Sequence, residues 1–563
     1  MASVLSIPQT VRHVRRYAEI ISILGKHGLR DVIQELGLDR LVERGITLVS
    51  RGEPEPGLHH LSRIVRIRRA MEELGPTFIK LGQVLATRPD LIPPAWAREL
   101  ELLQDDCPVV DYADIRARLE GAFPGRVDQV FAEIDIVPLA AASIGQVHRA
   151  KLHDGTRVVI KVLRPKIEEI TRTDMEILTD LAAIIEKRVQ NSGINPSEVV
   201  REFSRELAKE VDLTHEARAT DRLRNAFKDD PRIVFPLVYW DASARTVLTL
   251  EEIVGVPLSD TEAVGALPLE ERKAMVEAGA DAVLRMCLEQ GFFHADPHPG
   301  NLFALSEGRI GFIDCGMTGQ LDAKTAEQLA DLVSGVVSGD SDAVIDVVGV
   351  LADAELETLE DRTFRADVRD FVSRFQNVPL DKLDMSQLLG EFFNKLREHS
   401  LTCPGDMVLL IKALTTIEGV GVRIDPSFDM ITRARPYIEK LVRRRYGVAA
   451  MGERLRHATA QYAELVEDMP KEVRGLLKQV RRNRLAINLE HRGLTRLTHT
   501  IEHASRNISF ALIISAMLVG SSILVLADRS PTSWMLTALG VGGFLAAAVL
   551  VILIVISNRK MRE

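Results

Sequence analysis

The stretch that most constrains the fold covers residues 291–316 and reads GFFHADPHPGNLFALSEGRIGFIDCG. It contains two short apolar runs, 302–305 and 310–313, which are separated by the turn signal Ser-Glu-Gly at 306–308. The pattern predicts a two-stranded ribbon with a polar cluster beside each strand. Because a tight turn joins the two strands, both clusters are expected at the same end of the ribbon.

The two polar clusters contain the residue types that phosphoryl transfer requires. Asp296 and Asn301 lie five residues apart before the first strand, and Asp314 follows the second. One carboxylate is needed to orient or deprotonate the acceptor, while an Asn and an Asp hold Mg²⁺ against the nucleotide phosphates. We therefore expect Asp296 to be catalytic and Asn301 and Asp314 to bind metal. The alternative is a solvated hairpin in which Asp, Asn and Pro only form turns.

A second strand pattern, over residues 137–162, predicts a hairpin that covers a nucleotide. Its turn signal is Asp-Gly at 154–155, and the β-branched strand that follows, 157–162, carries Lys161. In kinase small lobes such a strand lysine contacts the α- and β-phosphates of ATP. Lys161 is therefore expected to be catalytic as well as to bind ATP. The other residues expected at the ATP site are Leu139, Ala140, Ala141, Ala142, Ser143, Ile144, Gly145, Gln146 and Val147 of this hairpin, together with Glu216.

The tip of this hairpin departs from the usual kinase pattern. A glycine-rich loop lets backbone N–H groups approach the phosphates closely, whereas residues 140–143 here are Ala-Ala-Ala-Ser. Their side chains restrict φ and crowd the phosphates, so we expect a different ATP geometry from that of ordinary protein kinases. His148, on the second strand, is expected to be a surface residue without a catalytic role.

A helical segment supplies the acidic groups that a kinase site needs. Residues 171–225 have a helical pattern rich in acids, and Glu216 is the candidate to pair with Lys161. Glu210 and Asp212 are then two extra carboxylates near the same site. The alternative for this segment is an exposed charged helix.

A hinge between two lobes is predicted after the strand pattern of residues 246–253, which leads into a Gly/Pro break at 255–257. The backbone at Glu252 and Ile253 is expected to bind the adenine edge of ATP.

The N-terminal residues, 1–125, have a helical pattern with a linker or turn at 51–57. Within this region Lys80 and Gln83 fall three residues apart and share one helical face. From the residues alone, both side chains are expected to be solvated surface groups.

Length and composition restrict the organisation of the chain and its class of partner. At 563 residues the chain is too long for one core, and its net charge of −9 argues against a nucleic-acid partner. The four cysteines are widely scattered, which supports neither a disulfide framework nor a zinc site and suits a reducing compartment. The expected units are 1–125, 126–253, 254–445, 446–506 and 507–556.

The C-terminal region predicts a membrane hairpin. Residues 471–506 carry nine Lys or Arg against three Glu, and they precede two uncharged apolar stretches, 508–527 and 534–556. Each stretch is long enough to span a bilayer as a helix. The basic flanks place both ends in the cytoplasm. The alternative is a buried helical pair in a soluble core.

Six motifs occur in one order along the chain: Lys80-Leu-Gly-Gln83, Ala140-Ala-Ala-Ser143, Val158-Val-Ile-Lys161, Glu210-Val-Asp212, His294-Ala-Asp296-Pro-His-Pro-Gly-Asn301 and Ile313-Asp314-Cys-Gly316. With this combination the chain resembles the AarF/UbiB family, atypical kinase-like proteins linked to ubiquinone biosynthesis in bacteria and mitochondria. The resemblance covers about residues 70–440, and the C-terminal hairpin is also similar to that of bacterial UbiB. It implies an α+β, bilobal protein-kinase-like fold with an N-terminal helical extension and a C-terminal transmembrane helical hairpin in the cell inner membrane.

The resemblance implies that the helix carrying Lys80 and Gln83 lies over the active site, where a protein substrate otherwise binds. Lys80 is then near Glu210 and Asp212, and all four residues become candidates for regulation. The resemblance implies the roles already expected for Lys161, Glu216, Asp296, Asn301 and Asp314. Kinases usually have Phe after the metal-binding Asp, whereas this chain has Cys315, which argues against the usual Phe-mediated switching.

These observations together predict a membrane-anchored, ATP- and Mg²⁺-dependent kinase-like enzyme that supports ubiquinone biosynthesis. Its expected partners are membrane lipid, quinone precursors and other proteins of ubiquinone biosynthesis. One alternative is an ATPase that extracts lipid intermediates or assembles biosynthetic enzymes, with water as the only acceptor. Another alternative is a nucleotide-binding scaffold without turnover, against which the intact set of Lys, Asp, Asn and Asp argues.

Overall fold

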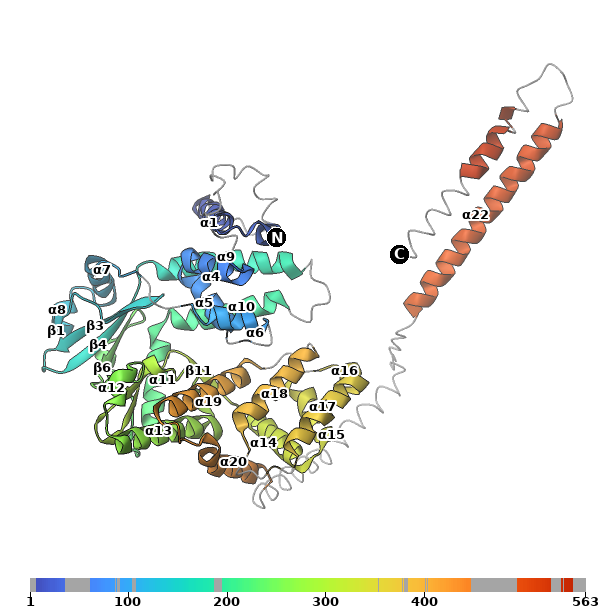
Figure 1. The fold of residues 1–563 in the computed structure, drawn as a ribbon. Coiled ribbons are helices and arrows are strands. Elements are labelled where there is room, and N and C mark those ends of the chain that lie inside the picture. Colours follow the sequence, from blue (N-terminus) through green and yellow to red (C-terminus); the bar gives the residue numbers. More distant parts are fainter. Residues whose placement is uncertain are drawn as a thin grey trace, which may run out of the picture. The chain divides into compact units, whose positions relative to one another are not determined.

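A computed structural model of the protein describes residues 7–35, 61–86, 88, 92–103, 108–186, 195–352, 354–376, 378, 383–399, 401, 404–446, 494–527, 538–539 and 541–549. The chain divides into two compact units, Met1–Leu455 and Arg456–Glu563. Every sheet that the structure describes belongs to the first unit, and the helix α22 (Leu494–Ala527) belongs to the second. Figure 1 shows the elements of each unit.

An antiparallel five-stranded sheet forms the smaller lobe of the first unit (Figure 1). Its strands run in the order β1-β3-β4-β6, with β2 paired to β3. Their bounds are β1 (Phe131–Ile134), β2 (Ala140–Ala141), β3 (Gly145–Leu152), β4 (Arg157–Leu163) and β6 (Val247–Glu251). In β4 the side chains of Val158, Ile160 and Val162 are fully buried. Because successive side chains of a strand alternate, Lys161 lies on the opposite face.

The β3–β4 hairpin turns at the predicted Asp-Gly pair, where Gly155 has a φ of +88° that suits glycine. Two short helices, α7 (Tyr112–Ala122) and α8 (Val127–Val130), pack on the face of the sheet away from Lys161. Their buried residues Ile115 and Leu119 join the core formed by the buried β4 side chains. On the Lys161 face of the sheet, Leu248 and Leu250 of β6 pack in a second core with Leu213 and Ala217.

The helices expected near the N-terminus form a separate core. Their bounds are α1 (Ile7–Lys26), α2 (Arg30–Glu35), α4 (Arg63–Leu74), α5 (Pro76–Ala86) and α6 (Pro94–Leu100). Of these, α1, α2, α4 and α5 pack with α9 (Ile167–Glu186) and α10 (Pro196–Glu210), which follow the strand that carries Lys161, whereas Leu100 of α6 packs in a small separate cluster with Ala86 and Leu103. Leu29, Phe78 and Phe203 are among the buried side chains of this core. The core fixes α5 beside α10.

The larger lobe contains the predicted ribbon. β9 (Leu302–Ala304) and β10 (Ile310–Phe312) pair antiparallel, with a short 3-10 turn, Ser306–Gly308, between them. β5 (Ile233–Val234) and β7 (Val256–Pro257) extend this pair into a sheet of order β5-β10-β9-β7. β8 (Phe292–His294) pairs with β11 (Thr318–Gln320). The expected loop, strand, turn and strand are confirmed.

Helices make up the rest of the larger lobe. They are α11 (Leu213–Ala226), α12 (Thr261–Gly265), α13 (Leu269–Leu284), α14 (Ala323–Ser338), α15 (Ser341–Leu351), α16 (Leu356–Glu360), α17 (Arg362–Phe375), α18 (Met385–Glu398), α19 (Gly405–Ile424) and α20 (Met430–Tyr446). A π-helical turn, Arg285–Gln290, continues α13 towards β8. The main core lies between these helices and the four-stranded sheet.

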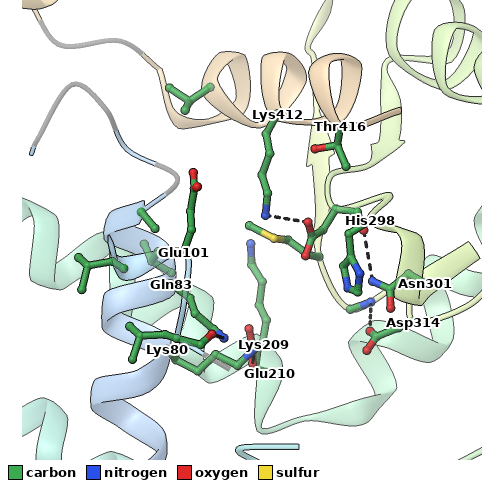
Figure 2. Close-up of a pocket in the computed structure, with 18 of the residues that line it drawn as sticks. Lys80, Gln83, Glu101, Lys209, Glu210, His298, Asn301, Asp314, Lys412 and Thr416 are labelled. Atoms are coloured by element: carbon green, nitrogen blue, oxygen red, sulfur yellow. Dashed lines mark hydrogen bonds and ion pairs between the residues drawn. The ribbon is translucent and has the colours of Figure 1, made fainter. Parts of the chain in front are cut away.

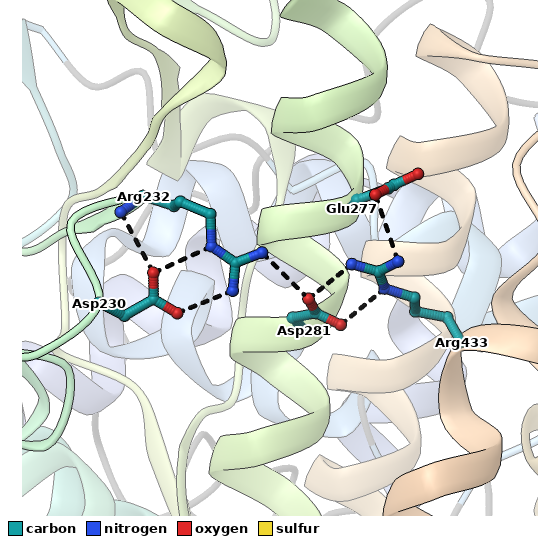
Figure 3. Close-up of polar contacts among 5 residues, drawn as sticks. All are labelled: Asp230, Arg232, Glu277, Asp281 and Arg433. Atoms are coloured by element: carbon teal, nitrogen blue, oxygen red, sulfur yellow. Dashed lines mark hydrogen bonds and ion pairs between the residues drawn. The ribbon is translucent and has the colours of Figure 1, made fainter.

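Charged side chains connect α13, α20 and the segment before β5 (Figure 3). Asp281 of α13 accepts two hydrogen bonds of 2.7 Å from the guanidinium of Arg433 on α20. Arg232 lies 3.4 Å from the same carboxylate and is itself paired with Asp230 at 2.8 Å. The bidentate contact fixes α20 against α13 by geometry as well as by charge.

The second unit does not support the predicted transmembrane hairpin. Across the described residues, no helix combines the length and the apolar character that crossing a membrane requires. α22 includes the first apolar stretch, while most of the second stretch, 534–556, lies outside the described residues. Residues 447–493, which make up most of the predicted basic segment, also lie outside them.

Candidate active site

A cavity of about 1070 Å³ lies within the first unit and brings the predicted site residues together. Its walls come from α5, β4, the loop after β2, the α10–α11 junction, the segment around the ribbon, and the helices α18 and α19. Figure 2 shows the side chains that point into it. The predicted site residues that line the cavity are Lys80, Gln83, Ala142, Ser143, Ile144, Lys161, Glu210, Asp212, Glu216, Asp296, Asn301 and Asp314.

The predicted pair between Lys161 and Glu216 is present. Lys161 Nζ lies 2.8 Å from Glu216 Oε2 and 3.3 Å from Asp314 Oδ2. Glu216 is buried in the first turn of α11, and Asp314 follows β10. One ammonium from the smaller lobe therefore joins two carboxylates, one of which comes from the end of the ribbon.

Burial and charge act against each other in this cluster. Burial raises the pKa of the Glu216 carboxyl to about 7, and the nearby Lys161 only partly opposes this. Burial also disfavours the charged form of Lys161, but the carboxylates of Asp314 and Glu216 outweigh it and raise the Lys161 pKa. For Asp314, which is surrounded by protein although the cavity leaves its side chain accessible, the loss of solvation is outweighed by the charges of Lys161 and Lys80, which hold its pKa well below the usual range. Lys161 and Asp314 are thus both charged at neutral pH.

The ribbon places Asn301 and Asp314 at the same end, as predicted. The Ile313 N–H donates to the Asn301 carbonyl at 2.9 Å. Because Asp314 follows Ile313, this backbone bond brings Asp314 close to Asn301. Asp314 has a φ of +53°, which is uncommon for a residue with a side chain, and its Oδ1 accepts the Gly316 N–H at 3.2 Å. Backbone strain of this kind persists only where surrounding contacts enforce it.

Asp296 is held by its own loop and by a helix that is distant in sequence. The Asn301 amide donates to the Asp296 carbonyl at 3.2 Å (Figure 2). The buried ring of His294 accepts the Asp296 N–H through Nδ1 at 3.1 Å, and its Nε2 faces the Ile313 carbonyl at 3.3 Å. Burial lowers the pKa of His294, which fits this neutral tautomer. The Asp296 carboxylate meets Lys412 Nζ at 2.7 Å.

The helix α5 makes one of the two contacts expected of it. Lys80 Nζ lies 3.2 Å from Glu210 Oε2, so Lys80 is not the solvated group that its local sequence indicates. Gln83 donates to the Leu103 carbonyl at 3.2 Å. Asp212 instead caps α11, where its Oδ1 accepts the Thr214 N–H at 3.1 Å.

Only the centre of the predicted ATP loop reaches the cavity. Ala142, Ser143 and Ile144 line it, and Arg164 fixes the loop by donating to the Ala142 carbonyl at 2.9 Å. The loop residues that do not line the cavity are Leu139, Ala140, Ala141, Gly145, Gln146 and Val147. Gln146 is fully buried and exchanges hydrogen bonds with the Val110 backbone. That these loop residues bind ATP stays a prediction.

His148 is buried, which contradicts the surface position predicted for it. Its side chain is fully inaccessible, and Nδ1 lies 2.8 Å from the Asp135 carbonyl. Tyr112 of α7 packs against the ring with 6.0 Å between the ring centroids. The misplacement arose because the sequence pattern did not predict that α7 covers this face of the sheet.

The hinge residues Glu252 and Ile253 do not line the cavity. The Glu252 N–H donates to the Arg157 carbonyl at 3.3 Å, and the Glu252 side chain pairs with Arg149 and Arg157 at 2.8 and 2.7 Å. The N–H expected to bind adenine is thus engaged within the smaller lobe.

The donor set at the ribbon end fits Mg²⁺ when a nucleotide supplies the remaining ligands. Within the described residues, no three His, Cys, Asp or Glu side chains gather as a metal site would require. Mg²⁺ is commonly bound through one or two carboxylates together with water and substrate phosphates. The Asp314 carboxylate is 47% exposed towards the cavity, and the Asn301 amide, which donates through its nitrogen, keeps its oxygen for a ligand.

Sequence reasoning missed Lys412 and the other cavity residues of α19. A signal was present, because Lys412 is the only charged residue in the apolar run 407–417. A lone cation inside such a run needs a polar partner when the helix is packed. The identity of that partner could not be read from the sequence.

Residues 102–348 match the ABC1 atypical kinase-like domain, 368–429 the UbiB helical domain, and 492–560 the ABC1/UbiB kinase-like C-terminal domain. The chain is 33% identical over 529 residues to the "Probable protein kinase UbiB" of Tolumonas auensis, covering 92% of this chain and 94% of the relative. It is 34% identical over 446 residues to the protein of that name in Pseudomonas aeruginosa, covering 77% and 82%. The solved Rv3197–erythromycin complex from Mycobacterium tuberculosis matches with a TM-score of 0.41 and 22% identity, covering 66% of this chain and 92% of that chain.

Proposed function

The chain belongs to the ABC1/UbiB family of atypical kinase-like proteins, and from this premise we propose that it transfers the terminal phosphoryl group of ATP in a Mg²⁺-dependent reaction. The observation that carries the proposal is the cluster of Lys161, Glu216 and Asp314 in one cavity with Asp296 and Asn301. Phosphoryl transfer relies on positioning and charge stabilisation more than on covalent chemistry, and this cluster supplies both.

Each side chain has a distinct task in this proposal. Lys161, held by Glu216, binds the α- and β-phosphates from the smaller lobe. Asn301 and Asp314 hold Mg²⁺, which neutralises charge on the phosphates. Asp296 faces the acceptor hydroxyl or water and receives its proton.

We propose that the acceptor, where it is not water, is an amphipathic molecule of ubiquinone biosynthesis. The cavity has an apolar wall beside the charged cluster, formed by Leu100, Leu103, Phe393, Leu396, Leu401, Val408 and Ile411. A molecule with a polar head at Asp296 and an apolar body along this wall fits the lining. The relatives named UbiB support the choice of pathway.

The second candidate function is an ATPase that uses turnover to move lipid intermediates or to assemble biosynthetic enzymes. The ion pair of Lys80 with Glu210 favours it, because α5 closes the wall of the cavity where a peptide substrate otherwise docks. In that case water takes the place of the acceptor at Asp296.

We further propose that the second unit associates with the cytoplasmic face of the inner membrane. Support comes from the nine basic residues of 471–506 and from the exposed apolar side chains Ile508, Leu512 and Val519 of α22. Basic segments are attracted to anionic lipid headgroups.

The test follows the γ-phosphate. Purified full-length protein is incubated with γ-labelled Mg-ATP, with and without liposomes that contain phenolic quinone precursors. Labelled precursor identifies a small-molecule kinase, and labelled free phosphate alone identifies an ATPase. An Asp296→Asn variant is the control for contaminating activity. Equal turnover by this variant and the wild type contradicts the proposal.

A further inference from the structure

Lys412 occupies a position in the cavity that none of the six sequence motifs covers. It lies on α19, beyond the kinase-like region matched at 102–348 and within the helical region matched at 368–429. Its Nζ nevertheless lies 2.7 Å from Asp296 Oδ1 in the kinase-like region (Figure 2). The helical region therefore contributes a cation to the carboxylate that faces the acceptor.

The packing of α19 fixes where this ammonium lies. Leu410, Ala413 and Leu414 are buried in the main core and hold the helix against α13. Lys412 and Thr416, one helical turn apart, lie on the face that lines the cavity. Figure 2 shows the Lys412 side chain extending from the helix into the cavity. A side chain on a packed helix is positioned more closely than one on a loop.

The three other lysines that line the cavity are engaged away from the acceptor. Lys209 pairs with Glu206 at 2.7 Å. Lys161 pairs with Glu216 and Asp314, and Lys80 pairs with Glu210. Lys412 instead meets Asp296. In phosphoryl transfer, negative charge is spread over the three equatorial oxygens of the moving group, between the nucleotide and the acceptor. The Lys412 ammonium beside Asp296 therefore lies where the phosphoryl group reaches the acceptor.

Building on the proposed function, we propose that Lys412 is a catalytic residue whose ammonium bridges the Asp296 carboxylate and the phosphoryl group during transfer. The bond from the γ-phosphorus to the β,γ-bridging oxygen breaks, and its electron pair stays on the ADP oxygen. A bond forms from the phosphorus to the acceptor oxygen, whose proton passes to Asp296 and then to solvent. Lys412 stays protonated and donates hydrogen bonds to Asp296 and to an equatorial oxygen.

The experiment compares full-length wild type with Lys412→Met, Asp296→Asn and the double variant. Methionine keeps the length and apolar character of the lysine stem, so α19 keeps its packing. Steady-state ATP turnover gives kcat, and thermal unfolding gives the effect of Mg-ADP with and without aluminium fluoride, a mimic of the transferring phosphoryl group. Arg423→Met removes an exposed cation from the same helix, outside the cavity, and is the matched control.

The expected result is a loss in kcat on the order of 100-fold for Lys412→Met, the size seen when one donor to transition-state charge is removed. Its affinity for Mg-ADP should change by less than about threefold, while the added stabilisation by aluminium fluoride is lost. The double variant should be no slower than Asp296→Asn alone, because the two side chains act together. Arg423→Met should match the wild type.

Two outcomes overturn the inference, and they are distinct from failure of the proposed function. If Asp296→Asn loses activity while Lys412→Met keeps kcat and the aluminium fluoride effect, Lys412 is not catalytic although the site is. If Lys412→Met unfolds at lower temperature and loses Mg-ADP binding as well, its role is structural. If the wild type and Asp296→Asn turn over ATP equally, the proposed function itself is wrong.

Discussion

At the scale of single residues, the local sequence pattern predicts which way a side chain points, but not which residue it contacts. Strand alternation turns Lys161 away from the buried side chains of β4, and the ribbon brings Asp314 beside Asn301, so these positions could be predicted. The position of Glu252 could not be predicted, because its backbone and side chain are engaged by arginines on neighbouring strands. Lys412 could not either, since nothing local indicates which distant helix returns to Asp296.

Asp314→Asn should abolish stabilisation of the protein by Mg-ATP. The neutral amide cannot offset the charge of the cation, and it also leaves Lys161 with one carboxylate instead of two. The measurement is the thermal shift on adding Mg-ATP, with EDTA added to show the metal-free value. A shift in the variant equal to that of the wild type shows that Asp314 does not bind the metal.

The buried His148 should make stability fall with acidity. Burial lowers its pKa in the folded protein, opposed in part by the Asp135 carbonyl, so the unfolded chain takes up a proton first. The contribution of His148 to the free energy of unfolding is therefore complete above the ordinary histidine pKa of about 6.5 and is lost as the pH falls below it. The free energy of unfolding then decreases by up to about 1.4 kcal/mol per pH unit. Urea unfolding between pH 7.5 and 5.5 should show a shallower loss for His148→Gln. His294, buried in the same way, gives the wild type a further slope that the variant retains.

At the scale of elements, the helix and strand patterns predicted the sheet of the smaller lobe and the ribbon of the larger one. They failed where one element covers another. α7 buries His148, and the core that α5 shares with α9 and α10 brings Lys80 to Glu210. Local amphipathicity shows that a helix has an apolar face, but not which partner that face will meet.

Lys80→Ala should release α5 from Glu210 and widen access to the cavity. Loss of this partly buried ion pair costs about 1 kcal/mol, so the fold should persist. We expect new autophosphorylation in vitro together with lower quinone content in cells that carry only the variant. Lys26→Ala, which breaks the pair with Glu73 at 2.9 Å, is the matched control. Normal quinone content and no new phosphorylation would falsify the regulatory role.

Asp281→Ala should loosen α20 from α13. The change removes the acceptor of two 2.7 Å hydrogen bonds and leaves Arg433 with Glu277 at 3.2 Å as its remaining carboxylate (Figure 3). We expect a loss of about 2 kcal/mol in the free energy of unfolding, because a largely covered arginine loses its main partner. Denaturant unfolding measures it, and Asp342→Ala, an exposed partner of Arg365, should cost far less. Equal losses in the free energy of unfolding for the two variants would show that the α13–α20 contact stabilises the fold no more than an exposed ion pair does.

At the scale of the whole molecule, the division into two units separates the catalytic proposal from the membrane proposal. Every residue of the candidate site lies within Met1–Leu455. The basic segment 471–506 and the helix α22 lie within the other unit. The two proposals can therefore be tested independently.

A chain that ends at residue 455 should fold, bind Mg-ATP with the affinity of the full-length protein and lose its association with membranes. Thermal unfolding and nucleotide titration measure the first two properties, and sedimentation with liposomes after a high-salt wash measures the third. Continued sedimentation of the shortened chain would locate a membrane contact in the first unit.

The walls of the cavity come from α5 near the beginning of the first unit and from α19 near its end. A polypeptide emerging from the ribosome therefore has the Lys161 strand and the ribbon available well before α19 has been synthesised. Until Lys412 and Thr416 leave the exit tunnel, the cavity lacks one wall and Asp296 lacks its cation. Under the proposed function, the nascent chain therefore cannot turn over ATP until nearly the whole first unit has been made.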